Sequence, residues 1–200
     1  MIKLYGVRAS RASRCLWMLE ELGIPYENVP THFAGDAQSA EFKKLNPNGR
    51  VPVLDDDGLV VFESMAINLH LADKDRGGLA PRDAAERAHA VQWSFWVMTE
   101  IEPGLIDAFL NRVMLPSDQR DPKVAAAGEA KLARPLAVLD AELAKRSWLV
   151  GDRFTVADLN VASVLFIAPM AQVDLAKYPN LQRWLAACTS RPAAKRAIGG

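Results

Sequence analysis

The residues from 46 to 69 are the best suited in this chain to holding a ligand. They predict a strand entered through Val51 and Pro52, a tight turn, a second strand, and a helix that begins at Glu63 and Ser64. Free N–H groups and the positive end of the dipole make a helix start a natural carboxylate site. A serine there can also cap its own helix. The pattern indicates a site that offers backbone groups as well as side chains.

The elements that must position this stretch alternate between strand and helix. Apolar spacing is helical from Ala12 until Gly23, and Asp57-Gly58 is a short hairpin signal. The helical crossover makes the first two strands parallel. The fold class predicted here is α/β in the order β-α-β-α-β-β-α, with one small mixed sheet. Its elements are strands at 2–5, 26–29, 51–54 and 59–62 and helices at 12–22, 37–45 and 64–73.

No strand pattern follows, so we expect a second, all-α domain built as a helical bundle. We place a first domain at 1–76, a linker at 77–83 and the helical domain at 84–200. Pro103 and Pro135 should bend the first two of its helices. The third is apolar nearly all round and should be the buried centre. Its helices are expected at 84–109, 124–145, 156–168, 181–189 and 193–198.

Two further patterns concern packing in the helical domain. The first helix should bury one face, made of Val91, Phe95, Met98, Ile101, Leu105 and Phe109. The third helix should begin with a capping box between Thr155 and Asp158, with Phe154 packed on Leu159 as a staple. We interpret Asp158 as a folding signal and not as a catalytic carboxylate.

Composition excludes several functional classes. The chain has 24 basic and 24 acidic residues, interspersed, so neither a nucleic acid nor a membrane surface is an expected partner. No apolar run is long enough to span a membrane, and no charged leader opens the chain, so we expect a cytoplasmic protein. Single, scattered histidines predict no metal site. Cys15 and Cys188 are expected to be buried free thiols.

These features together resemble the cytosolic glutathione S-transferase superfamily over essentially the whole chain. The resemblance rests on Val51-Pro52 before a hairpin, Glu63-Ser64 opening a helix, the all-helical second half and the capping segment at 151–158. It is nearest to bacterial, phi- or theta-like members with serine at the thiol site. It implies a thioredoxin-like first domain that binds glutathione as co-substrate, without a metal, and a homodimer.

The resemblance assigns roles to four residues. The Val51-Pro52 bond should be cis, so that the Val51 N–H and C=O pair with the extended glutathione peptide. An ordinary trans proline on an edge strand is the alternative. Ser64 should hold the γ-glutamyl carboxylate while Glu63 faces the α-amino group.

The thiol of the bound glutathione should lie at the start of the first helix. One hydrogen bond to the charged sulfur lowers the pKa of a thiol by roughly one to two units from ~8.5. Ser10 is the first choice, because it precedes Arg14 by four residues as in several related families. Ser13 is the rival, and Tyr5 is a distant third. Either serine can instead be an N-cap.

The sequence specifies less clearly which residues bind the glycyl end of glutathione. Relatives often carry basic residues near 37–38, where this chain has Ala37 and Gln38. We include Gln38 and Arg50 among the glutathione-binding residues, although an exposed, solvated Arg50 is the alternative. Without those basic residues we expect either weaker binding of glutathione or a compensating role for Arg8, Arg11 or Arg50.

The sequence predicts a detoxification enzyme that transfers glutathione to a small, electrophilic and hydrophobic substrate. Trp93, Trp96 and Val97 share a helix face that could line the acceptor site, or could pack in the core or a dimer interface. Glutathione-dependent disulfide reduction or peroxide reduction is one alternative activity. A non-catalytic binding or scaffold protein of the same fold is the other alternative.

Overall fold

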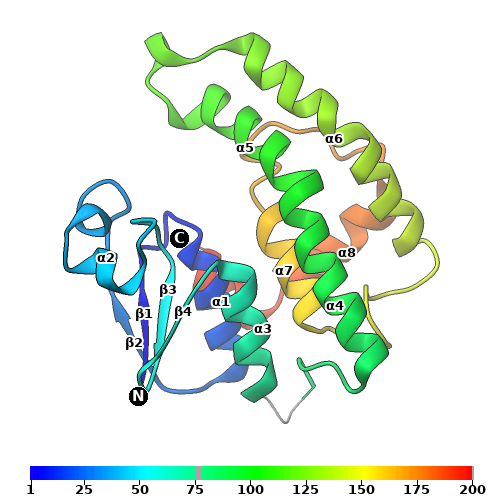
Figure 1. Cartoon of the computed structure of the whole chain (residues 1–200). Coiled ribbons are helices and arrows are strands. Elements are labelled where there is room, and N and C mark those ends of the chain that lie inside the picture. Colours follow the sequence, from blue (N-terminus) through cyan, green and yellow to red (C-terminus); the bar gives the residue numbers. More distant parts are fainter. Residues whose placement is uncertain (75–77, 200) are drawn as a thin grey trace. The chain divides into compact units, whose positions relative to one another are not determined.

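A computed structural model describes residues 1–74 and 78–199, which form two compact units (Figure 1). One unit combines Met1–Pro81 with Arg191–Gly200, and the other is Arg82–Ser190. The predicted boundary at residues 76 and 77 falls outside the described part of the chain. Each unit has its own hydrophobic core.

The first unit is built on a four-stranded mixed sheet in the order β2-β1-β3-β4 (Figure 1). β1 pairs with β2 in parallel and with β3 antiparallel, and β3 and β4 form a hairpin. Helices α1 and α3 lie on one face and α2 lies on the other. The predicted sheet and element order are confirmed. The strands are β1 (Ile2–Tyr5), β2 (Tyr26–Val29), β3 (Val53–Asp56) and β4 (Leu59–Phe62); the helices are α1 (Ala12–Leu22), α2 (Phe42–Leu45) and α3 (Ser64–Lys74).

The predicted helix at 37–45 is wrong in extent. The chain forms a 3₁₀ turn, η1 (Asp36–Gln38), and only then the short helix α2. Between them Ser39 is extended, with φ −63° and ψ 150°, and its Oγ accepts a hydrogen bond from the Phe42 N–H at 3.1 Å. A serine that caps the next turn in this way ends the preceding one.

The third strand starts two residues later than predicted. The Val51-Pro52 peptide bond is cis, as expected, and β3 begins at Val53. Because proline has no N–H, Pro52 cannot contribute a donor to the ladder. The turn therefore stands outside the sheet.

The second unit consists of helices in its described residues (Figure 1). Every residue of α7 is buried, which confirms it as the centre of this unit. Helix α6 continues through Pro135. The helices are α4 (Ala84–Trp96), α5 (Glu102–Phe109), α6 (Pro122–Leu143), α7 (Val156–Leu165) and α8 (Pro179–Thr189), with a short 3₁₀ turn, η4 (Ser117–Gln119).

The predicted helix at 84–109 is interrupted before Pro103. A π-helical turn, η2 (Val97–Ile101), separates α4 from α5, and a second, η3 (Leu110–Met114), follows α5. Proline removes a helical hydrogen bond and clashes with the carbonyl four residues earlier. A wider turn accommodates both effects.

The predicted inner face of the first helix of this unit is confirmed only in part, because Ile101 and Leu105 are buried but Phe95 of α4 is not. Phe95 is 68% exposed, whereas Ala90, Trp93 and Ser94 are buried. Ala90 and Ser94 are small enough for α7 to approach, and Asn160 Nδ2 of α7 donates to Ser94 Oγ at 2.8 Å. Close packing of small residues here takes precedence over the larger apolar stripe.

The predicted capping box at the start of α7 is confirmed. Asp158 accepts hydrogen bonds from the Thr155 N–H at 3.0 Å and the Thr155 hydroxyl at 3.1 Å. It also accepts from the Leu149 N–H at 2.8 Å and from Trp184 Nε1 at 2.9 Å. Burial raises the pKa of Asp158, against the opposing effect of these donors. The carboxyl thus joins a loop and two helices.

The last helix, α9 (Pro192–Ile198), belongs to the first unit and not to the helical domain in which we placed it. It packs on α1, and Arg191 just before it and Arg196 within it pair with two acidic residues of that helix. Arg191 binds both carboxylate oxygens of Glu21 at 2.6 and 2.7 Å, and Arg196 Nε binds Glu20 at 2.6 Å. These ion pairs fix the helix to the first unit.

In the described ranges, 1–74 and 78–199, no helix combines the length and apolarity that a membrane span needs.

Candidate functional site

Gly6, directly after β1, brings two parts of the predicted site together. A Cβ placed on Gly6 would lie 3.5 Å from the Val51 Cβ and 3.7 Å from the Ser10 Oγ. It would also approach the Ala12 Cβ to 2.5 Å, so a side chain has no room, and Gly6 has φ +149°. Only glycine tolerates this position. The start of α1 and the proline turn therefore meet across one residue that sequence reasoning missed.

The Ser10 hydroxyl is partly exposed and held by two backbone groups. It donates to the Val7 carbonyl at 2.6 Å and accepts from the Ala12 N–H at 3.2 Å. A hydroxyl has one hydrogen to donate. To hydrogen-bond a thiolate, Ser10 would have to turn away from Val7 while keeping the bond from Ala12.

Ser13 is less accessible than Ser10. Its side chain is 5% exposed, and its hydroxyl donates to the Ser10 carbonyl at 3.0 Å. This is the local bond that serine commonly makes within a helix. Of the two candidates, Ser10 is the one that faces solvent.

Two side-chain amides hydrogen-bond to the backbone just before the proline turn. Asn46 Nδ2 donates to the Arg50 carbonyl at 2.7 Å, and Gln38 Nε2 donates to the Gly49 carbonyl at 2.8 Å. The amide of Gln38 is thus used inside the protein. Arg50 is exposed. Gln38 and Arg50 border the turn, and their contact with a ligand stays a prediction.

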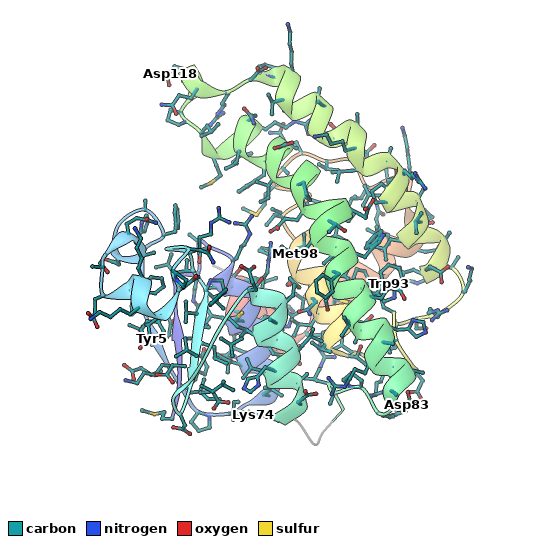
Figure 2. All side chains as sticks on the ribbon, in the orientation of Figure 1. Tyr5, Lys74, Asp83, Trp93, Met98 and Asp118 are labelled. Carbon is teal, nitrogen blue, oxygen red and sulfur yellow. The ribbon has the colours of Figure 1, made fainter. Side chains whose placement is uncertain are left out.

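Tyr5 serves packing in this structure. Tyr5 is labelled in Figure 2. Its ring meets that of Phe42 edge-on, with centroids 6.2 Å apart, and packs against the cluster of Ala37, Phe42, Val51 and Val53. This contact fixes α2 beneath the turn. The structure gives no support to Tyr5 as the group that binds the thiol.

Glu63 and Ser64 form the junction between β4 and α3. Glu63 is exposed and has φ +75°, a conformation that costs a non-glycine residue ~1–3 kcal/mol and is often retained at functional sites. Its carbonyl accepts the Ile67 N–H at 2.9 Å, so it precedes the first turn of α3. Ser64, the first residue of α3, is 3% exposed.

Helix α1 holds Ser64 in place. Arg14 Nη1 donates to Ser64 Oγ at 3.4 Å, and the Cys15 thiol lies 3.7 Å from the Ser64 carbonyl oxygen. Arg14 is itself buried. These contacts place a positive charge behind the carboxylate site predicted at Ser64, which strengthens attraction for an anion there.

Both cysteines are free and buried, as predicted. Burial raises the pKa of the Cys15 thiol, although the charge of Arg14 opposes this. A thiol in its neutral form is a poor nucleophile. Cys15 is thus a packing residue of α1.

Arg8 was one of the residues considered for binding a glutathione carboxylate, but here it makes a hydrogen bond within the protein. Its Nη1 donates to the Arg196 carbonyl oxygen at 2.6 Å, at the end of α9. This holds the loop before Ser10 against the last helix.

No residue of the second unit is assigned to a binding site for the electrophilic substrate. Trp93, which is labelled in Figure 2, and Val97 are buried. The ring of Trp96 meets that of Trp93 edge-on, with centroids 5.0 Å apart. These positions favour the interpretation that Trp93, Trp96 and Val97 pack in the core and do not line the site of the electrophilic substrate. Within the described residues no group of acidic, histidine and cysteine side chains is arranged to hold a metal.

A mixed sheet in the order β2-β1-β3-β4, with a cis-proline turn beside the start of α1, defines a thioredoxin-like unit. A helical unit follows it in the chain. The comparisons give the family. Residues 1–73 match the glutathione S-transferase N-terminal domain and residues 94–192 match the glutathione S-transferase C-terminal domain.

Known relatives span the whole chain. Glutathione S-transferase GstB of Escherichia coli strain K12 is 34% identical over 203 residues, which cover 99% of this chain and 98% of that one. Glutathione S-transferase 1 of Zea mays is 36% identical over 207 residues, covering 98% and 94%. The chain belongs to the glutathione S-transferase family of enzymes.

Solved structures of glutathione transferases have the same fold as this chain. The theta class glutathione S-transferase of Xanthomonas axonopodis pv. citri, with glutathione bound, has a TM-score of 0.91 at 33% identity, covering 100% of this chain and 97% of that one. A glutathione transferase of Burkholderia graminis, with two glutathione molecules per subunit, has a TM-score of 0.85 at 33% identity, covering 98% and 87%.

Proposed function

We propose that this protein conjugates the thiolate of glutathione to a small, hydrophobic electrophile. The observation that carries the proposal is the convergence of the Ser10 Oγ and Val51 on Gly6. A peptide paired with the backbone at Val51 would place its cysteinyl sulfur near Ser10, which lies just before α1 and has the more exposed hydroxyl of the two candidate serines. The relatives with bound glutathione support this ligand.

The peptide would bind through charges of matching sign. Ser64 and the N–H groups of the first turn of α3 would receive the γ-glutamyl carboxylate, with Arg14 behind them. The exposed Glu63 carboxylate would meet the α-amino group. The Val51 N–H and C=O would pair with the cysteinyl residue as one more strand would.

Ser10 would then stabilise the thiolate. Its hydroxyl would exchange the Val7 carbonyl for the sulfur, a charged acceptor that forms the stronger hydrogen bond. The Ala12 N–H would stay bonded to Ser10 Oγ and polarise the hydroxyl further. With a thiol pKa of ~8.5 in water, one such bond makes the thiolate a major species near neutral pH.

Disulfide reduction through a mixed disulfide with the protein is the weaker alternative, whereas peroxide reduction by bound glutathione needs no protein cysteine. An exchange mechanism that forms a mixed disulfide with the protein needs an accessible cysteine thiolate. Cys15 and Cys188 are both 0% exposed, so neither is available for that step. The scaffold alternative predicts no turnover with any electrophile.

We further propose that the enzyme acts in detoxification as a cytoplasmic homodimer. A second subunit would cover apolar side chains that are exposed in the single chain, of which Phe95 is the most exposed aromatic among the described residues. Light scattering at micromolar concentration would test the dimer.

The test of function is glutathione titration followed by conjugation to an activated chloronitroarene. We expect saturable glutathione binding below millimolar concentration and turnover that depends on Ser10. No binding at millimolar glutathione would exclude both enzymatic activities. Binding without conjugation, but with peroxide or disulfide reduction, would favour the alternative activity.

A further inference from the structure

Val7 and Ser10 are the two ends of a tight turn between β1 and α1. The Val7 carbonyl oxygen accepts the Ser10 N–H at 3.0 Å and the Ser10 hydroxyl at 2.6 Å. To stabilise a thiolate, the hydroxyl must leave this carbonyl and point at the sulfur, while the N–H stays bonded. The inference below rests on the proposed function and concerns what holds the turn in place during that change.

The two sides of the turn are held differently. On the helix side, Ser10 Oγ accepts the Ala12 N–H at 3.2 Å, and the Ser10 carbonyl oxygen accepts the Ser13 N–H at 3.1 Å and the Ser13 hydroxyl at 3.0 Å. The tip of the turn, Arg8 and Ala9, is exposed. Exposed turns are the mobile parts of a fold unless another element holds them.

The side chain of Arg8 connects this tip to the last helix of the chain. Its Nη1 donates to the Arg196 carbonyl oxygen at 2.6 Å, in the last turn of α9. Carbonyl groups in the last turn of a helix have no partner within the helix, and a guanidinium is a suitable donor to them. The turn is therefore held from outside as well as from α1.

The acceptor of this bond is itself fixed to α1. Arg196 Nε donates to a Glu20 carboxylate oxygen at 2.6 Å, and Arg196 Nη2 donates to the Glu20 carbonyl oxygen at 3.3 Å. The other carboxylate oxygen of Glu20 accepts the Tyr26 hydroxyl at 2.9 Å. Hydrogen bonds from Arg196 hold the pKa of Glu20 below its ordinary value, against the effect of burial, and the charge of Arg8 acts in the same direction.

These contacts form a closed ring. It runs from the turn through Arg8 to the backbone of α9, from Arg196 to Glu20, and along α1 back to Ser10. A ring of this kind fixes the position of the turn relative to the start of α1.

We propose that Arg8 is a positioning residue for the thiolate, because its bond to the Arg196 carbonyl holds the turn still while the Ser10 hydroxyl points at the sulfur. A hydroxyl has one hydrogen to donate. If the turn were free to move, the Val7 carbonyl would follow the hydroxyl and compete with the sulfur for that hydrogen. Arg8 acts through Ser10 and contacts neither glutathione nor the electrophile, and α9 takes part in activating the thiol.

The experiment separates thiolate formation from peptide binding in the full chain. The thiol pKa of bound glutathione is measured from thiolate absorbance against pH, and binding is measured by calorimetric titration with S-methylglutathione, which has no thiol. We expect Arg8→Met to raise the thiol pKa by about half a unit to one unit and to leave the affinity for S-methylglutathione unchanged. With the activated chloronitroarene, kcat/KM near pH 6.5 should fall about three- to tenfold.

A second variant tests the ring through α9. Arg196→Met keeps the carbonyl that binds Arg8 but frees it from Glu20, so the thiol pKa should rise, and by less than in Arg8→Met. The double variant should show no larger rise than Arg8→Met alone, because both residues act through one connection. Lys195→Met, at an exposed position of the same helix, is the control and should match the parent.

The measurements are repeated at high salt to separate position from charge. At 1 M salt the charge of an exposed arginine is screened within about 3 Å, so an effect of charge alone on the sulfur would vanish. The difference between Arg8→Met and the parent should persist there if Arg8 acts by holding the turn.

Several results would overturn the assignment. An unchanged thiol pKa in Arg8→Met would exclude Arg8 from thiolate formation, and a rise that disappears at high salt would reduce its role to charge. Loss of S-methylglutathione affinity would make Arg8 a ligand of the peptide. Additive rises in the double variant would show that Arg8 does not act through α9. If the parent binds neither glutathione nor S-methylglutathione, the proposed function itself fails.

Discussion

Gly104 of α5 and Gly128 of α6 face each other where these two helices cross. A Cβ on Gly104 would lie 2.6 Å from the Gly128 carbonyl oxygen, and a Cβ on Gly128 would lie 2.6 Å from the Gly104 carbonyl oxygen. Both residues are buried. The helix backbones therefore touch, and the helical unit depends on two positions without side chains.

Replacing Gly128 with alanine should destabilise the protein, although alanine favours an exposed helix by ~1 kcal/mol. The added methyl group must displace backbone, so we expect a net loss of about 1–3 kcal/mol in the free energy of unfolding. Urea unfolding measures it. The opposite change at the exposed neighbour, Ala127→Gly, should cost only ~1 kcal/mol through helix propensity. A stabilised Gly128→Ala would contradict the close contact.

Asp158→Ala should be among the most destabilising single changes. It leaves Thr155, Leu149 and Trp184 with buried donors that have lost their acceptor, and we expect a cost of about 3–5 kcal/mol. Denaturant unfolding measures the total change in the free energy of unfolding. The exposed Asp152, paired with Arg82 at 3.0 Å, is the control, and Asp152→Ala should cost under ~1 kcal/mol.

Ser10→Ala should raise the pKa of the bound glutathione thiol by about one to two units. Thiolate absorbance of the complex against pH measures this, and activity near pH 6.5 should fall about 10- to 100-fold but recover in alkali. Ser13→Ala should leave the thiol pKa unchanged, because its hydroxyl is turned to the Ser10 carbonyl. A raised thiol pKa in Ser13→Ala alone would reverse the assignment.

Glu86 should give stability a specific pH dependence. Hydrogen bonds from Arg153, at 3.1 and 3.2 Å, and from the Arg82 N–H hold the pKa of Glu86 below its ordinary value, against the effect of burial. A carboxylate with a lowered native pKa stabilises the fold above its unfolded pKa of ~4.3, and this contribution is lost as pH falls through the native value.

Glu86→Gln should therefore cost about 1–2 kcal/mol at pH 7 and progressively less below pH ~4. Thermal unfolding across this range measures the difference from the parent. Glu100→Gln, at an exposed position of the same unit, should change stability by less than ~0.5 kcal/mol. A difference that is constant from pH 7 to 3 would show that the charge is not what stabilises the protein.

Local signals predicted much of the fold. The capping box at Thr155 is written in a few adjacent residues and is confirmed. The cis bond at Pro52, which the family resemblance implied, is confirmed as well. The predicted inner face of the first helix of the second unit was wrong at Phe95, because Phe95 continues an apolar stripe, whereas the packing surface of α4 uses the small residues Ala90 and Ser94. Periodicity does not say which of two faces fits a neighbour.

The site could be predicted only in part. Ser10, Val51 and Ser64 were proposed because their motifs lie in short stretches that resemble the family, and their contacts with glutathione stay predictions. Gly6 was missed, because its importance comes from its closeness to Val51 and Ser10, which no spacing in the chain encodes. A glycine directly after the first strand was the one available signal for Gly6.

The position of α9 affects how this protein can be made and recombined. During synthesis the first unit must wait for the whole of Arg82–Ser190 before α9 exists to pair with Glu20 and Glu21. Its folding therefore cannot finish before the unit that follows it has been synthesised. For the same reason, a chimera that joins residues 1–81 to another helical unit would need the α9 of this chain as well.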